Sequence, residues 1–209
     1  MMQSLDRGAK NWVRSLRHPA GAALRTQGMV GRAEIELLYQ LASQVPADRC
    51  IVEIGSYRGQ SAIALGLGAL AGHHAPVYAI DPHEEFVGEL GGQFGWRDRE
   101  AFMRNVTRAK CAEVVRLVNL PGHLVGMAWE KPVGLLFLDG DHSYEGVRGD
   151  FIAWAPHLTP DATLLLDEWK NKNTGVPRLI ETDLIPAGWH RTATAKDVTA
   201  MTHSPSSDS

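Results

Sequence analysis

Short apolar runs alternate with stretches of helical periodicity between residues 50 and 190. Such runs predict strands that are buried on both faces, and their alternation with helices is typical of βαβ units in a parallel sheet. The sequence therefore predicts an α/β fold with a doubly wound, mostly parallel seven-stranded sheet that ends in a C-terminal antiparallel hairpin. The expected strands are Cys50–Ile54, Val77–Ile80, Val114–Val118, Val133–Leu138 and Ala162–Leu166, followed by the hairpin strands His190–Thr194 and Val198–His203.

The helical stretches fall before and between these strands. In the first of them Ile35, Leu38 and Leu41 recur at helical spacing until Pro46 ends the pattern. The sequence shows no internal repeat, so we expect one domain over residues 28–203. The expected helices are Arg32–Gln44, Gln60–Ala71, Arg97–Ala109, Gly122–Trp129, Tyr144–Pro156 and Val176–Ile185.

The two ends of the chain differ from this domain in composition. Residues 1–27 carry five basic residues against Asp6, and Trp12, Val13 and Leu16 are spaced to share a helix face. We expect a basic helical arm that packs on its own domain or on a partner subunit; the alternative is a helix on a membrane surface. Residues 204–209 are rich in Ser and Asp and are expected to form a disordered tail.

Composition narrows the class of protein. The chain has 209 residues, 44% of them hydrophobic, and its 21 basic and 24 acidic residues offer no broad basic face for duplex nucleic acid. Its cysteines, Cys50 and Cys111, lie beside predicted buried strands and are interpreted as core thiols of a reducing compartment. We see neither a signal peptide nor a membrane span, so we expect a cytoplasmic protein.

Acidic residues follow two of the apolar runs. Because the carboxyl ends of parallel strands meet at one edge of the sheet, these side chains should converge. Converging carboxylates repel one another unless a cation holds them, so we expect a hard metal ion at this edge. The first group is Asp139, Asp141 and the neighbouring His142, and the second is Asp167 and Glu168.

The first predicted strand leads into a glycine-bearing turn, EIGSYRGQS, that precedes a helix. Gly55 would let the backbone approach a ligand, unless it serves only an ordinary tight turn. Glu53 would repel a pyrophosphate but would suit a cationic amine, and the G-x-G-x-x-G dinucleotide pattern is absent. Asp81 ends the second strand, where an acid accepts the hydroxyls of a ribose; its alternative is a helix N-cap or turn residue.

Together these motifs resemble a known family. E-x-G-x-x-x-G on strand one, an acid after strand two, FLDGDHSY on strand four and a D-E pair after strand five are similar to the class I S-adenosylmethionine-dependent methyltransferases. VEIGSYRGQSA and FLDGDHSYEGV resemble more closely the small metal-dependent O-methyltransferases, of the catechol type and of the antibiotic-sugar and cephamycin-biosynthesis type. The resemblance covers about residues 27–205. It implies a Rossmann-like fold, S-adenosyl-L-methionine, and Mg²⁺ or another divalent cation as cofactors.

The resemblance also implies roles for individual residues. Its cofactor-binding positions are Glu53 and Gly55 at the methionine moiety, Tyr57 and Ser61 around the methionine carboxylate, Asp81 at the ribose, and Gly122 and His123 in the loop that encloses adenine. Its metal ligands are Asp139, Asp167 and Glu168. The third metal position is asparagine in the catechol enzymes and acidic in the sugar enzymes.

His142 stands where the family carries a proton-accepting lysine or histidine. A hydroxyl beside a divalent cation is acidified and needs an acceptor that titrates near neutral pH, which suits histidine as the catalytic base. A lone loop histidine is more often a surface or hydrogen-bonding residue. Asp141 is interpreted as the cap of the next helix, with orientation of His142 as the alternative.

The predicted function is metal-dependent methyl transfer from S-adenosylmethionine to a hydroxyl of a small diol-bearing natural product, a sugar or a phenol. The alternatives are a metal-dependent glycosyl or phosphoryl transferase that uses Asp139 and Asp141, and a non-catalytic ligand-binding domain. Residues 84–95 and 169–175 are candidate lids; the alternatives are a disordered insertion for the first and a plain connection for the second. The resemblance implies a homodimer or larger homo-oligomer, with the basic arm as the contact.

Overall fold

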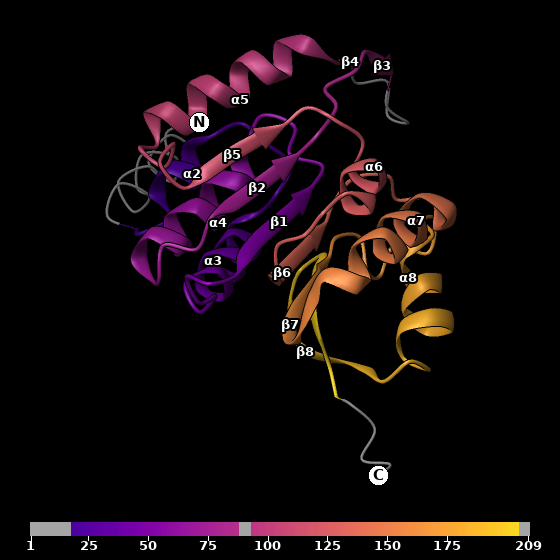
Figure 1. The fold of residues 1–209 in the computed structure, drawn as a ribbon. Helices are drawn as coiled ribbons and strands as arrows, with labels where there is room; N and C mark the ends of the chain where they lie inside the picture. The colour runs from indigo at the N-terminus through magenta and orange to yellow at the C-terminus, as the bar shows by residue number, and fades with distance from the viewer. Residues whose placement is uncertain (1–17, 88–92, 205–209) are drawn as a thin grey trace, which may run out of the picture.

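A seven-stranded sheet forms the centre of the molecule in the computed structural model, which describes residues 18–87 and 93–204 (Figure 1). The sheet order is β5-β2-β1-β6-β7-β9-β8. The first five strands pair in parallel, and β9 is antiparallel to both β7 and β8. The predicted doubly wound sheet with its antiparallel hairpin is confirmed. The strands are β1 (Cys50–Ile54), β2 (Val77–Ile80), β5 (Val115–Val118), β6 (Val133–Leu138), β7 (Leu158–Leu166), β8 (Trp189–Ala195) and β9 (Val198–His203).

Helices cover both faces of this sheet (Figure 1). One face carries α2 (Gly21–Arg25), α3 (Arg32–Ala42), α4 (Gln60–Ala71) and α5 (Trp96–Arg108). The other face carries α6 (Gly122–Met127), α7 (Tyr144–Trp154) and α8 (Val176–Leu179). The result is a three-layer α/β/α arrangement.

Alternate residues of the central strands supply two separate cores. In β6, Leu135 and Phe137 pack toward α3, α4 and α5, whereas Leu136 and Leu138 pack toward α6, α7 and α8. All six residues of β6 are buried. An unbroken apolar run in the sequence is therefore what a strand with a helix layer on each face requires.

Helix α4 is buried over most of its length, because it packs against the sheet and against α2, α3 and α5. Its sequence, QSAIALGLGALA, is apolar on every side. A side chain at Gly68 would collide with the carbonyl oxygen of Tyr39 in α3, so glycine there lets the two helices pack closely. This packing fixes the position of α4 against α3 on one face of the sheet.

Several predicted boundaries are wrong. Strand β7 begins at Leu158 instead of Ala162. Residues 159–162 lie opposite the single residue Gly134 of β6, and the proline among them is typical of a turn, so the sequence did not predict this part of the strand. The helix expected to run to Ile185 changes at Ile180 into the π-helix η2 (Ile180–Leu184), and α7 ends in the short 3₁₀ turn η1 (Ala155–His157). A small antiparallel pair, β3 (Phe86–Val87) and β4 (Gln93–Phe94), lies in the glycine-rich segment and was not predicted.

Some predictions concern residues outside the described ranges. Most of the basic arm (residues 1–17), the centre of the first candidate lid (88–92) and most of the tail (205–209) belong to this group. Within the described part of the chain, every helix is too short or too polar to cross a lipid bilayer.

Candidate functional site

The carboxyl ends of the five parallel strands bring the predicted polar residues into one row. The strands pair in register up to their last residues, so the residues that follow them stand next to one another along one edge of the sheet. In order across the sheet these residues are Asn119, Asp81, Gly55, Asp139 and Asp167. The row contains both the predicted cofactor loop and the predicted metal site.

Gly55 occupies the most crowded position of this row. Its φ is +85°, a conformation that side-chain-bearing residues rarely adopt. A Cβ atom there would collide with the carbonyl group of Asp139. The backbone of β1 can therefore turn beside β6 only because residue 55 is glycine.

The carboxylate of Glu53 is completely buried at the end of β1. Neither of its oxygens accepts a hydrogen bond from the described residues, although the Ser61 hydroxyl lies near. Burial raises the pKa of Glu53 well above its ordinary value; Ser61 offsets part of the shift, and the negative charges of Asp139 and Asp81 add to it. An unpartnered buried carboxylate is costly, so this position fits a ligand that brings a cation or a donor.

The carboxylate of Asp81 organises the turn after β1. Its Oδ2 accepts the backbone N–H groups of Ser56 and Tyr57 at 3.0 and 2.8 Å, and its Oδ1 accepts the N–H of His83 at 2.8 Å. Tyr57 has a positive φ of 45°, and its ring meets that of Phe94 edge to face at 5.2 Å. Asp81 therefore fixes the predicted ligand loop, while its Oδ1 keeps a lone pair for a further donor.

Two residues that the sequence analysis did not select complete this network. The Asn119 amide donates to the carbonyl oxygen of Asp81 and contacts Nδ1 of His83, both at 3.0 Å. Because an amide N–H is the donor in that contact, His83 Nδ1 is the acceptor, and Nε2 donates to the carbonyl of Tyr57 at 2.7 Å. Asn119 directly follows β5, so applying the strand-end rule to the third strand would have found it. His83 had no comparable signal.

Asp139, His142 and Asp167 form the second half of the site. One possible ligand atom from each lies within 4.8 Å of the others. His142 Nε2 is 3.5 Å from Asp139 Oδ1 and 4.0 Å from Asp167 Oδ2, and it forms no hydrogen bond with the described residues. These distances suit a shared cation.

The electrostatics of this cluster show that its charges are crowded. Burial and the neighbouring Asp139 raise the pKa of Asp167 to about 8. Burial also raises the pKa of Asp139, and His142 offsets this only in part. The pKa of His142 is raised as well, because the attraction of Asp139, Asp167 and Glu168 outweighs the effect of burial. Such mutual shifts are typical of a functional site.

Glu168 lies outside this group of ligand atoms. Its φ is +56°, and its Oε2 accepts the amide of Asn171 at 2.7 Å. Its predicted role as third metal ligand stays a prediction. The interpretation of Asp141 as the helix cap is wrong: Ser143 caps α7 by accepting the Gly146 N–H, and Asp141 accepts the N–H of Ser143 in the turn before it.

The loop 169–175 is held in place on both sides. Gly175 donates its N–H to the carbonyl of His142 at 2.7 Å, and Lys170 pairs with Asp197 in the β8–β9 turn at 3.1 Å. The buried Glu34 of α3 accepts the N–H of Asp197 and that of Gly31. This loop is therefore held at both ends beside the Asp139–His142–Asp167 cluster.

The predicted adenine residues lie at the start of α6. Gly122 is buried, and a Cβ there would press on Ile54 and Asp150, whereas His123 is exposed. The carbonyl of Gly122 accepts the indole N–H of Trp154 at 3.0 Å. Burial raises the pKa of Asp150 to about 6, and His123 partly opposes this rise. Gly122 thus lies against Ile54, the last residue of β1.

A family described as a methyltransferase domain matches residues 52–169, more than half of the chain. The chain belongs to this family. The matched region of this methyltransferase begins inside β1 and ends just after β7, so it contains every residue of the sheet-edge row. The predicted resemblance to class I S-adenosylmethionine-dependent methyltransferases is confirmed.

Solved structures show the same fold. The methyltransferase is similar to CalS11, described as a calicheamicin methyltransferase, with a TM-score of 0.64 and 15% identity over 80% of this chain and 76% of that one. It is similar to the O-methyltransferase NovP, with a TM-score of 0.60 and 18% identity over 85% and 82% of the two chains. It is also similar to PaMTH1 of Podospora anserina, solved with S-adenosylhomocysteine, with a TM-score of 0.62 and 16% identity over 94% of this chain and 87% of that one.

Proposed function

We propose that this methyltransferase moves the methyl group of S-adenosylmethionine to a hydroxyl oxygen of a small diol-bearing natural product, a sugar or a phenol, with Mg²⁺ or another divalent cation. The observation that carries the proposal is the buried, unpartnered carboxylate of Glu53 on the strand next to the Asp139–Asp167 cluster. The names of similar structures support a hydroxyl acceptor: CalS11 is described as a TDP-rhamnose 3′-O-methyltransferase and NovP as an O-methyltransferase.

The residues of the cofactor loop fit S-adenosylmethionine, which supplies an activated methyl group when bound. An ammonium group beside Glu53 would satisfy both oxygens and keep the carboxylate ionised. Gly55 leaves room for close approach, and Oδ1 of Asp81 can accept a ribose hydroxyl in addition to its one backbone donor. The remaining positions assigned to the cofactor are Tyr57 and Ser61 at the methionine carboxylate and Gly122 and His123 at adenine.

The carboxylates of Asp139 and Asp167 fit a divalent cation, because burial and the charge of Asp139 raise the pKa of Asp167 to about 8, and a cation between the two carboxylates would offset their repulsion. Such a cation, when bound, acidifies a hydroxyl that reaches it. We assign the released proton to Nε2 of His142, which faces both carboxylates and has no hydrogen bond within the described residues. Glu168 is retained as the third ligand.

Calorimetric titration with S-adenosylmethionine, in Mg²⁺ and then in EDTA, tests the cofactor assignment. We expect micromolar binding, about −8 kcal/mol, and a loss of at least tenfold in Glu53→Gln, because the amide cannot pair with an ammonium group. A screen of vicinal diols and catechols for methylated product follows. Absence of binding in both conditions, in a protein that is folded by circular dichroism, would contradict the proposal.

Two substitutions separate the ligand from the base. Asp167→Asn should lose both Mg²⁺ affinity and turnover, whereas His142→Gln should lose turnover while Mg²⁺ still binds. Equal loss of Mg²⁺ affinity in both variants would make His142 a metal ligand and overturn its role as base. Asp141→Asn serves as the matched control, because Asp141 lies outside the cluster of possible ligand atoms among the described residues.

A further inference from the structure

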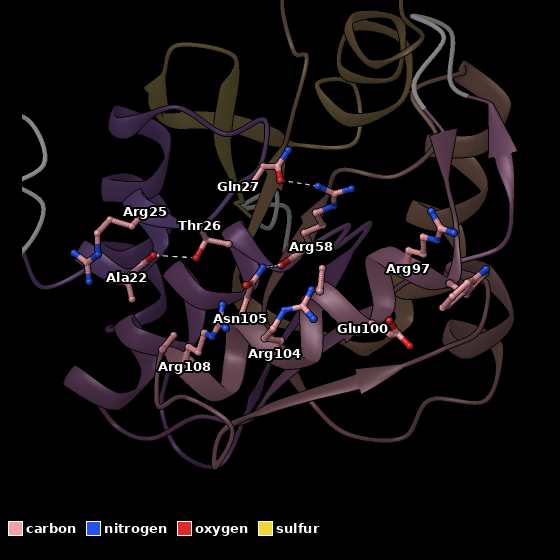
Figure 2. Close-up of a pocket in the computed structure, with 13 residues that line it drawn as sticks. Ala22, Arg25, Thr26, Gln27, Arg58, Arg97, Glu100, Arg104, Asn105 and Arg108 are labelled. Carbon is pink, nitrogen blue, oxygen red and sulfur yellow. Dashed lines mark hydrogen bonds between the residues drawn. The ribbon is translucent and has the colours of Figure 1, made fainter. Parts of the chain in front are cut away.

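A cavity lies between α2 and α5, apart from the sheet-edge row (Figure 2). Its volume of about 670 Å³ is within the range of small-molecule sites. Arginines dominate its lining: Arg25, Arg58, Arg97, Arg104 and Arg108, with Glu100 as the acidic residue among the described lining residues. The chain as a whole has a net charge of −3, so this positive charge is a local feature.

Three of the arginines share one face of α5. Arg97, Arg104 and Arg108 are separated by seven and four residues, which places them in a line along the helix, with Asn105 in the same lining. Within residues 18–87 and 93–204, none of the three forms an ion pair or a side-chain hydrogen bond; Arg97 lies over the Trp96 ring, 5.4 Å from its centre. Like charges held this closely favour an anion between them.

Arg58 is held in position at the same cavity. Its Nε donates to Asp98 Oδ1 at 2.7 Å, and its Nη1 donates to Gln27 Oε1 at 2.6 Å. Asn105 donates to the backbone carbonyl of Arg58 at 3.0 Å, which ties this residue to α5. Figure 2 shows Arg58, Arg104 and Arg108 gathered between α2 and α5, with Arg97 toward the other end. The cavity therefore combines the guanidinium of Arg58, which hydrogen bonds hold in place, with those of the three arginines along α5.

We propose that this cavity binds a nucleoside diphosphate. Guanidinium groups bind phosphate oxygens through paired N–H donors, which makes arginine the residue of choice for phosphate recognition. Arg97 and Arg108 are roughly 16 Å apart along the helix axis, so a single phosphate cannot contact both ends of the line. Trp96, which is 45% exposed, lines the cavity, and its ring offers a surface on which a base can stack. A ligand with two phosphates and a planar base can contact both the line of arginines and the Trp96 ring.

Calorimetric titration of the full chain with uridine diphosphate, pyrophosphate and uridine tests the proposal. We expect uridine diphosphate to bind more tightly than either fragment. Arg104→Gln combined with Arg108→Gln should weaken its binding at least tenfold. Trp96→Ala should reduce uridine diphosphate to the affinity of pyrophosphate and leave pyrophosphate unchanged. The matched control is Arg99→Gln, an exposed arginine of the same helix outside the cavity lining, which should bind as the unaltered chain does.

Several results would overturn the proposal. These are absence of binding at millimolar uridine diphosphate, equal losses in Arg99→Gln and in the double variant, and no effect of Trp96→Ala. The proposal would also be overturned if a single-stranded RNA bound much more tightly than uridine diphosphate and depended on Arg104 and Arg108, because the cavity would then be part of a nucleic-acid surface. The cavity shares no residue with the proposed cofactor or metal sites, so S-adenosylhomocysteine affinity should be unchanged in the double variant. The outcome is therefore independent of the methyl-transfer proposal.

Discussion

Replacing Asp167 by Asn should stabilise the metal-free protein at neutral pH. The unfolded chain releases the Asp167 proton near pH 3.8, whereas the folded chain holds it to a pKa of about 8. Between these values the folded state binds more protons, so the free energy of unfolding falls as pH rises. Each pH unit accounts for up to about 1.4 kcal/mol, and from pH 5 to pH 7 the loss should approach roughly 3 kcal/mol. Asn cannot ionise, so Asp167→Asn should escape this loss.

Urea unfolding in EDTA at pH 5, 6, 7 and 8 measures the effect. The unaltered chain should lose stability steadily over this range relative to Asp167→Asn. Saturating Mg²⁺ should then restore stability to the unaltered chain and leave the variant unchanged. Asp48→Asn, which changes an exposed aspartate in the turn before β1, should follow the unaltered chain. Parallel pH profiles for Asp167→Asn and the unaltered chain would refute the electrostatic reasoning.

Three further predictions concern the backbone and the loop network. Gly55→Ala should destabilise the fold by roughly 1–3 kcal/mol from backbone strain alone, and the collision of the new Cβ with Asp139 should add to this loss. A melting temperature equal to that of the unaltered chain would contradict this prediction. Gly149→Ala, inside α7 where an added Cβ meets nothing within 4 Å, should instead gain about 0.5–1 kcal/mol in the same thermal melt. Asn119→Ala should weaken S-adenosylhomocysteine roughly tenfold, the worth of one or two hydrogen bonds, because Asp81 and His83 lose their support; unchanged affinity in calorimetry would show that the network is not needed.

The sequence predicts the sheet well because its strands are buried on both faces. The bounds of β1, β2, β6 and β9 were predicted correctly, and for β6 the reason is that helix layers on both sides demand uninterrupted apolar residues. Strand β7 was predicted too short because the residues around Pro160 do not pair with β6. Pro160 and Asp161 are exposed, so the apolar pattern that predicts buried strands does not extend over them.

The sequence predicts that the acidic residues at the strand ends converge, but not how the loops that follow them are arranged. Acids at strand ends are visible in the sequence, and the sheet register then brings Asp81, Asp139 and Asp167 to one edge. Glu168 has a positive φ and lies outside the Asp139–His142–Asp167 cluster. Its position depends on the path of the loop after β7, which the sequence pattern does not reveal. The arginine cavity was missed for a related reason: Arg104 and Arg108 look like an ordinary solvated helix face until α2 is placed opposite them.

The buried carboxylate of Glu34 has a consequence for the boundary of the domain. It joins the chain at Gly31 to the β8–β9 turn at Asp197, and that turn holds Lys170 of the loop 169–175 beside the Asp139–His142–Asp167 cluster. The first helix after the arm is therefore mechanically connected to the far end of the sequence. A cut or fusion placed close before α3 acts on the catalytic edge, whereas the same change a few residues earlier spares this link.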